Sequence, residues 1–169
     1  RFTLHEDEPH FVERIAFVAR MLGSTMNVSQ VPESKIVRVQ VHGPAFAGMI
    51  RQFVQGDYSS GKHLHRTAWS QGYGFLQSML NGYLAGDGSW TERQGRRPHW
   101  RIGFTRENTA LADDLRTLCA IFGYRISIVE GYSKANEKEY PTWVGWIKSN
   151  EQTYNQKDLN QISSITPET

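Results

Sequence analysis

The sequence predicts an α+β protein made of two related halves, because one pattern of helix and strands occurs twice. Residues 1–28 align without a gap on residues 101–128. A chance match between two amphipathic helices is the alternative, but a match that runs through strand, helix and strand favours duplication. The coinciding apolar pairs are Phe2/Ile102, Leu4/Phe104, Phe11/Leu111, Ile15/Leu115, Val18/Leu118, Met21/Ile121, Leu22/Phe122, Met26/Ile126 and Val28/Ile128.

Each copy changes its hydrophobic period at the same place. The first copy has helical spacing from Phe11 to Leu22 and the second from Leu111 to Phe122. Gly23 or Gly123 then ends the helix, and alternation begins at residue 26 or 126, which predicts a strand. Second strands are expected over 36–42 and 142–148, with polar hairpins over 29–35 and 130–141 between the strands.

The remaining chain completes the second half. We expect a short helix over 44–53, a polar connector over 56–69 and a longer helix from about 70 to 87. A strand over 89–94, a basic turn over 95–98 and a strand over 99–105 follow. The second half is therefore helix, strand, strand, helix, strand, strand. The first half begins at its second strand, so its opening helix and first strand are missing from this sequence.

Composition limits the class of protein. The chain has 169 residues, 38% hydrophobic and 21% charged, which is enough for a sizeable core. The sequence has no membrane-spanning apolar run and no signal peptide, so we expect an intracellular protein with no membrane partner. The single cysteine, Cys119, excludes an internal disulfide and a cysteine-based zinc framework. His63 and His65 are better interpreted as surface or DNA contacts than as zinc ligands, because no third ligand lies nearby. A net charge of +2, with basic runs at 62–66 and 93–101, is compatible with a nucleic-acid surface.

A short motif carries the chemistry. The long helix ends Leu80-Asn81-Gly82-Tyr83-Leu84-Ala85-Gly86-Asp87-Gly88. This segment resembles the LAGLIDADG motif of homing endonucleases, in the repeated helix–strand–strand setting of that family. It departs from the motif at Asn81 and at Ala85, where the family more often has an acid. The resemblance extends from residue 1 to about 149 and implies two pseudo-symmetric αββαββα halves with a saddle-shaped antiparallel sheet, the first half being incomplete.

The resemblance also implies the site residues. It implies a metal site at Asp87 and Gly88, with Asp87 as a catalytic ligand of Mg²⁺, and a second catalytic residue, Lys148, near the metal. Hard carboxylate oxygens suit Mg²⁺, which can promote phosphodiester hydrolysis. Gly82, Ala85 and Gly86 place small residues on one side of the helix, where a second motif helix could approach closely. The alternative for Asp87-Gly88 is an ordinary helix-ending turn.

Double-stranded DNA is the partner that the resemblance implies, and alternation gives the strands an outer polar face. Val37, Val39 and Val41 should face inward in one strand, and Trp100, Ile102 and Phe104 in another. Basic and polar residues on the other face could read bases in the major groove or contact phosphates. The predicted DNA-binding residues are Arg38, Gln40, His42, Arg93, Arg96, Arg97 and Arg101. A solvated sheet face is the alternative for any single residue.

Four segments follow from this interpretation. Residues 1–55 form the C-terminal part of a first LAGLIDADG repeat, 56–69 a connector, 70–150 the second repeat, and 151–169 a tail toward a possible intein splicing domain. Because Asp87 shifted back by one hundred falls outside the sequence, we expect a complementing N-terminal segment to supply the first motif helix. Three hypotheses stay open: an intein-associated, site-specific DNA endonuclease; an inactive DNA- or RNA-binding module or maturase; and a structural remnant inside an intein.

Overall fold

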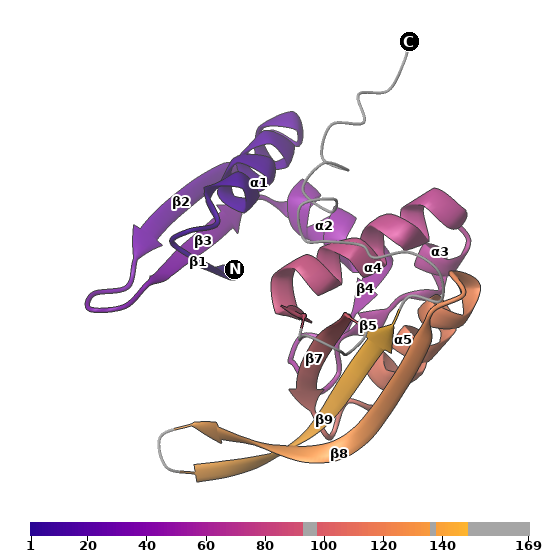
Figure 1. Ribbon diagram of the computed structural model, residues 1–169. Helices are drawn as coiled ribbons and strands as arrows, with labels where there is room; N and C mark the ends of the chain where they lie inside the picture. Colours follow the sequence, from indigo (N-terminus) through magenta and orange to yellow (C-terminus); the bar gives the residue numbers. More distant parts are fainter. Residues whose placement is uncertain (93–97, 136–137, 149–169) are drawn as a thin grey trace. The chain divides into compact units, whose positions relative to one another are not determined.

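The computed structural model describes residues 1–92, 98–135 and 138–148, which divide into two compact units. Unit 1 is Arg1–Phe53 and unit 2 begins at Val54. Each unit has its own antiparallel sheet with helices packed against it, which is the mixed α+β architecture expected from the sequence (Figure 1).

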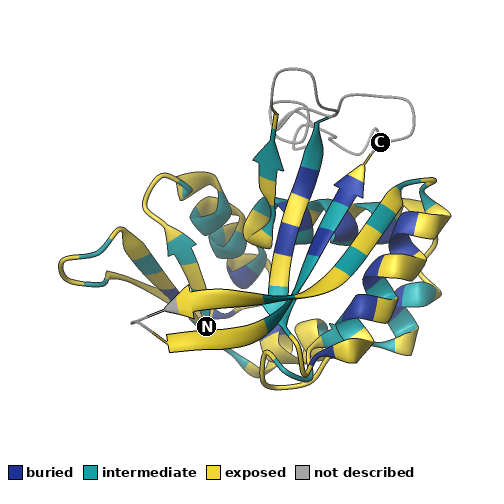
Figure 2. Ribbon diagram, turned by 60° about the horizontal axis from the view of Figure 1, so that its bottom comes forward, coloured by how far each residue is buried: buried dark blue, intermediate teal, exposed yellow. Residues whose placement is uncertain are grey.

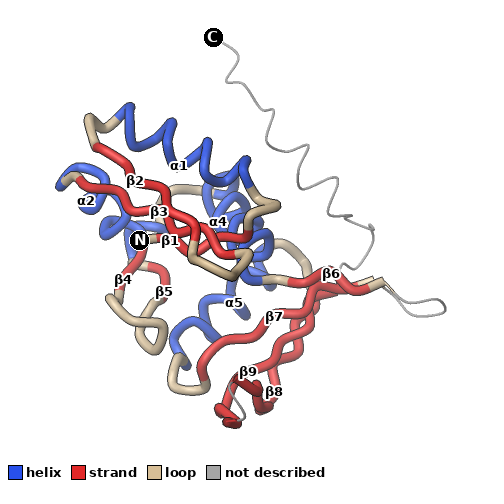
Figure 3. Tube along the Cα trace, turned by 90° about the vertical axis from the view of Figure 1, so that its left-hand side faces the viewer, coloured by secondary structure: helices blue, strands red, loops and turns tan. Residues whose placement is uncertain are grey.

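Unit 1 contains strands β1 (Phe2–His5), β2 (Thr25–Gln30) and β3 (Ile36–His42) and helices α1 (Pro9–Met21) and α2 (Pro44–Phe53). The strand order is β1-β3-β2, and Figure 3 shows these three strands side by side. Along β3 the valines are buried or half-buried and the residues between them are exposed, as the alternation predicted. The Phe2 and Phe46 rings meet edge to face with centroids 6.2 Å apart, which joins β1 to α2.

Unit 2 begins with a small hairpin, β4 (Val54–Gln55) and β5 (His63–Leu64), and continues through helix α3 (Arg66–Trp69) and the long helix α4 (Tyr73–Asp87). Then come β6 (Ser89–Thr91), β7 (His99–Thr105), α5 (Thr109–Ile121), β8 (Arg125–Ala135) and β9 (Lys138–Lys148). The four-stranded sheet has the order β6-β7-β9-β8, all antiparallel.

The core of unit 2 lies between helices α4 and α5 and one face of this sheet (Figure 2). Burial raises the pKa of the Cys119 thiol to about 12, which keeps it protonated and makes it a small core residue. The buried cluster consists of Leu76, Leu80 and Leu84 from α4; Leu115, Leu118 and Cys119 from α5; and Trp100, Ile102 and Ile147 from β7 and β9.

The stretch from β1 to β3 and the stretch from β7 to β9 have the same order of strand, helix, strand and strand. Helices α1 and α5 have bounds one hundred residues apart, and each ends at a glycine with positive φ, Gly23 at 62° and Gly123 at 70°. The strand orders β1-β3-β2 and β7-β9-β8 correspond strand for strand. Sequence periodicity therefore predicted the order and type of the elements in these two aligned stretches.

Three local predictions were wrong in extent. Residues 130–141 were expected to be a polar hairpin, but β8 continues to Ala135 and β9 starts at Lys138, because cross-strand pairing extends the ladder over polar residues. The 56–69 connector contains β5 and α3. The long helix begins at Tyr73 rather than near Ser70, after Gly72 with a φ of 87°.

Within residues 1–92, 98–135 and 138–148, none of the helices is long and apolar enough to cross a membrane.

We expect Leu80→Ala to destabilise unit 2 strongly. Leu80 is completely buried under the sheet, so truncation leaves a cavity and should lower the free energy of unfolding by about 2–5 kcal/mol. Urea denaturation followed by tryptophan fluorescence measures this, since all five tryptophans of the chain lie in unit 2. The exposed Ile121, also in unit 2, is the control, and Ile121→Ala should cost about 0.5 kcal/mol or less. Equal losses would contradict this core assignment.

Candidate functional site

The junction between α4 and β6 holds Asp87 in a fixed position. Leu76, Leu80 and Leu84 bind one side of α4 to the sheet, and the Gly88 N–H donates to the Leu84 carbonyl at 3.0 Å to end the helix. A Cβ on Gly88 would lie 2.4 Å from the Leu84 oxygen and 2.9 Å from Cε3 of Trp100. Only glycine fits this close approach, so Asp87 is presented where helix turns into strand.

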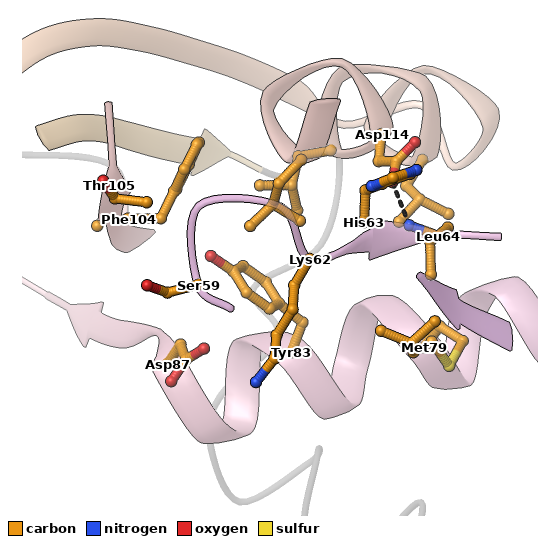
Figure 4. A pocket seen from close by; sticks show the side chains of 15 residues that line it. Ser59, Lys62, His63, Leu64, Met79, Tyr83, Asp87, Phe104, Thr105 and Asp114 are labelled. Carbon is orange, nitrogen blue, oxygen red and sulfur yellow. Dashed lines mark hydrogen bonds between the residues drawn. The ribbon is translucent and has the colours of Figure 1, made fainter. Parts of the chain in front are cut away.

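Asp87 lies at the edge of a cavity of about 420 Å³ between α4, α5 and the β4–β5 hairpin. Figure 4 shows the Lys62 side chain reaching from the hairpin toward α4, on the same side as Asp87, with the Tyr83 side chain close to both. Ser59, Phe104 and other side chains close the cavity; its full lining is Val54, Ser59, Lys62, His63, Leu64, Met79, Tyr83, Asp87, Gly103, Phe104, Thr105, Leu111, Asp114, Leu115 and Leu118.

Two opposing effects act on the Asp87 carboxyl group. Partial burial against the cavity wall raises its pKa above the usual value, and the nearby Lys62 ammonium lowers it. The pKa of Tyr83 is raised, first by burial and then by the negative charge of Asp87, so its hydroxyl stays protonated. That hydroxyl is buried and has no hydrogen-bond partner within the described residues. The site therefore combines a carboxylate, a cation and an unused hydroxyl.

Sequence reasoning missed Lys62 as a member of this site. Its only signal was the basic run 62–66, which gave no indication of which element it would face. The position depends on pairing of Val54 with Leu64, which folds the loop back toward α4. Gly56, with a φ of 89°, allows that loop to close, because a Cβ there would lie 2.1 Å from the Gly61 oxygen.

The structure places Lys148 away from Asp87. Val144 pairs with Gly103, which lines the same cavity as Asp87, whereas Ile147 pairs with Trp100. Lys148 follows Ile147, so it lies beyond the Trp100 end of this stretch of β7, away from Asp87. Lys148 does not line either cavity that contains Asp87. It pairs instead with Arg125, and both side chains are exposed. The catalytic role of Lys148 stays a prediction, and the register does not favour it.

The outer face of the unit 2 sheet forms a groove of about 730 Å³ that also reaches Asp87. Arg101 is exposed in this groove, on the face opposite the buried Trp100 and Ile102, as alternation predicted. Trp146 pairs with Arg101, so it shares this outer face. The groove is lined by Asp87, Ser89, Arg101, Ile102, Gly103, Phe104, Thr105, Tyr132, Ser133, Lys134, Tyr140, Pro141, Thr142 and Val144.

The sheet of unit 1 also has a polar outer face. Arg38, Gln40 and His42 are exposed on β3, and the register pairs them with Ser29, Asn27 and Thr25 of β2. All six side chains can form hydrogen bonds. The remaining predicted DNA contacts, Arg93, Arg96 and Arg97, lie outside the described residues.

The outward face of α4 carries the predicted helix interface. Gly82 and Gly86 are exposed, and a Cβ added at either would meet no atom within 4 Å. Ala85 is half-buried. This side of the helix thus has space for a close neighbour.

The described residues supply only part of the ligands that a divalent metal ion needs. Asp87 offers hard oxygen ligands at the end of a rigid helix, which suits Mg²⁺. Among residues 1–92, 98–135 and 138–148, no group of three or more His, Cys, Asp or Glu side chains could hold a metal ion. The Asp114 carboxylate, also in the cavity, already accepts a hydrogen bond from the Leu64 N–H. Asp87 could therefore supply one carboxylate to an ion that keeps several of its own waters.

Comparison with known families identifies this fold and motif. Residues 74–163, more than half of the chain, match the model of the LAGLIDADG-like domain. The chain belongs to the LAGLIDADG family. The match begins in α4, so it includes the motif ending in Asp87 and the sheet that follows. LAGLIDADG proteins are homing endonucleases or maturase-like proteins, they generally bind DNA, and the nucleases generally use a divalent metal. No curated protein matches the chain.

We expect Asp87→Asn to stabilise this LAGLIDADG protein at neutral pH. Since the folded-state pKa is raised, ionising Asp87 costs stability as pH rises through that pKa, and a neutral amide avoids this cost. The unfolding midpoint of the variant in urea should exceed that of the wild type at pH 7. The difference should vanish near pH 3, below the usual pKa of aspartate at about 3.9, where the wild-type group is protonated in both states.

Asp113→Asn is the matched control for this measurement. Asp113 is exposed and its carboxylate binds Arg116 at 2.8 Å, so losing its charge removes an ion pair and should bring no gain at pH 7. An Asp87→Asn variant no more stable than the wild type at pH 7 would contradict the unfavourable burial of this carboxylate.

Proposed function

We propose that this chain is part of a site-specific, Mg²⁺-dependent double-strand DNA endonuclease. The observation that carries the proposal is the position of Asp87, which lines both the cavity containing Lys62 and the outer groove containing Arg101. A phosphodiester lying along the groove would thus meet a carboxylate, with a cation behind it. Membership of the LAGLIDADG family supports the same chemistry.

In this proposal each group has a separate task. Asp87, with the Gly88 carbonyl beside it, binds Mg²⁺ at the helix end. The Lys62 ammonium offsets negative charge on the phosphate as the bond breaks. Arg101 orients the DNA backbone in the groove, and Lys148 with Arg125 extends that cationic surface. When bound, Mg²⁺ activates water and stabilises the leaving oxygen.

A second acid is needed, and a complementing segment carrying the first motif helix would supply it. Unit 1 supports this idea through the residues that match the unit 2 core. Ile102, Leu115 and Leu118 are at most 4% exposed, whereas their counterparts Phe2, Ile15 and Val18 are only half-buried. In unit 2 the covering element is α4, so the same face of unit 1 fits a helix of the same kind.

The two motif helices would meet through Gly82, Ala85 and Gly86. Small side chains let helix backbones approach closely, which would bring Asp87 near the acid of the partner helix. In that arrangement the two sheets form a pseudo-symmetric saddle along the major groove. Arg38, Gln40 and His42 would read one half-site, and Arg101 with Arg93, Arg96 and Arg97 the other.

An intein is the context we favour for this nuclease. Residues 1–55 would then complete the first repeat, 56–69 connect the repeats, 70–150 form the second repeat, and 151–169 lead back toward a splicing domain. An inactive DNA- or RNA-binding module is the second candidate. Ala85 favours it, because the family more often has an acid at that position.

We expect Asp87→Asn to abolish cleavage while sparing DNA binding. The change removes a metal ligand but no contact of the outer sheet face, so cleavage should fall by about 10²–10³-fold or more. The assay mixes the chain with a polypeptide carrying the first motif helix, target DNA and Mg²⁺, and measures cut product and binding separately. Asp113→Asn should keep full activity. Full cleavage by Asp87→Asn would sink the metal assignment, and binding without any product under every metal tested would favour the inactive module.

We expect Gly82→Leu to block assembly with the complementing helix without unfolding the chain. The added side chain finds open space on α4 of the isolated chain, and leucine favours helix over glycine by about 1 kcal/mol. Stability should therefore be kept or increased, while affinity for the complementing polypeptide, measured by calorimetry, should fall at least about tenfold. Thr117→Leu, on exposed α5 surface, is the control. Unchanged affinity of Gly82→Leu would exclude this face as the interface.

A further inference from the structure

The β4–β5 hairpin, residues 54–64, has few contacts of its own to fix its shape. Only Val54–Leu64 and Gln55–His63 pair as strands. Within the loop the Gly61 and Lys62 N–H groups donate to the Tyr58 carbonyl at 3.0 and 3.1 Å. A hairpin with two paired positions is marginal in water, so its position must depend on what it is bound to.

Asn108, at the start of α5, binds the loop of this hairpin. Its side chain is 1% exposed, and its Nδ2 donates to the carbonyls of Ser59 and Lys62, both at 2.8 Å. Its Oδ1 accepts from the Leu111 N–H at 3.0 Å and caps the helix. One buried amide therefore uses both donors on the hairpin and its acceptor on α5.

A second residue of α5 binds the end of the hairpin. The Leu64 N–H donates to Oδ2 of Asp114 at 2.5 Å. Burial raises the pKa of Asp114, and the hydrogen bond from Leu64 and the charge of His63 lower it. The hairpin is thus held at Ser59, Lys62 and Leu64 by a single helix.

Comparison with unit 1 separates this arrangement from ordinary packing. At the offset of one hundred, Asn108 corresponds to Glu8 and Asp114 to Arg14. Glu8 forms no side-chain cap on α1, and Arg14 is exposed. The apolar residues of the two helices match, whereas the two residues that bind the hairpin do not. Asn108 and Asp114 therefore differ from their counterparts at the positions that bind the hairpin, while the apolar core positions are kept.

We propose that Asn108 and Asp114 are positioning residues that hold the β4–β5 hairpin so that the Lys62 ammonium lies beside Asp87. A role of this Lys62 position in phosphodiester cleavage rests on the proposed function. The hydrogen bonds that hold the hairpin do not depend on that function. Lys62 has an exposed, flexible side chain, and the Lys62 carbonyl bound by Asn108 fixes where that side chain starts. Releasing the hairpin would leave the lysine in the chain but not at the site.

Carbodiimide cross-linking tests this placement without requiring activity or DNA. The reagent joins a lysine to a neighbouring carboxylate, and peptide mapping by mass spectrometry measures the yield of the Lys62–Asp87 link. We expect a clear yield in the wild-type chain and a loss of about tenfold in Asn108→Ser, since serine can still cap α5 but cannot reach both carbonyls. The internal control is the cross-link between Lys134 and Glu139, whose Nζ and Oε1 atoms lie 3.1 Å apart. The yield of that cross-link should not change.

Two further variants separate positioning from general destabilisation. Asp114→Asn keeps an acceptor for the Leu64 N–H and should retain the Lys62–Asp87 link, whereas Asp114→Ala should lose it. Ile147→Val, in the core away from the hairpin, should lower stability by about 1 kcal/mol and leave the link intact. Absence of the link in the wild type, or an unchanged yield in Asn108→Ser, would overturn the proposal. The proposal would also be overturned if the yield of the Lys62–Asp87 link fell as much in Ile147→Val as in Asn108→Ser.

Cleavage kinetics then distinguish this inference from the proposed function. If the complemented chain cuts DNA, Asn108→Ser and Lys62→Met should each lower kcat, and the double variant should be no slower than Lys62→Met alone. Additive effects would contradict action through Lys62. Should no cleavage occur while the cross-linking results are as expected, the nuclease proposal fails and the positioning of Lys62 stands.

Discussion

The packing of α4 on the β7–β9 face of the sheet is the constraint on which the rest of unit 2 depends. Leu76, Leu80 and Leu84 fix the side of the helix that faces the sheet, so the opposite side, with Gly82 and Gly86, must face outward. The same packing brings the helix end against Trp100, where only a glycine fits after Asp87. A core interaction thus sets both the small-residue face and the position of the acid.

The elements that depend on local period were predictable from the sequence. Helices α1 and α5, the glycines after them and the alternation along β3 and β7 all follow from short-range patterns, and the offset of one hundred added agreement between two copies. The place of Asp87 at the end of a helix was predictable because the motif that contains it is contiguous. The extended β8–β9 ladder was not, since cross-strand pairing there overrides a polar sequence that resembles a loop.

Lys62 shows why part of the site could not be predicted. Its position depends on Asn108, which is 46 residues away, and on Leu64 and Asp114, which are 50 residues apart. Nothing in a local window indicates such contacts. Lys148 shows what a local pattern leaves open: its place at a strand end was predicted, but the strand register decides which neighbour it has, and that neighbour is Arg125.

The two units share aligned apolar residues and differ in the outer faces of their sheets. In unit 1 Arg38, Gln40 and His42 on the outer face of β3 pair with Ser29, Asn27 and Thr25 of β2, and all six are hydrogen-bonding groups. In unit 2 the outer face includes Val129 and Val144, which pair with each other, beside Arg101 and the Arg125–Lys148 pair. The aligned strands β1 and β7 and helices α1 and α5 carry matching apolar residues, whereas Glu8 and Asn108, Arg14 and Asp114, and the outer residues of the two sheets differ. The two sheets thus present different outer faces, which the proposed reading of two unlike half-sites would require.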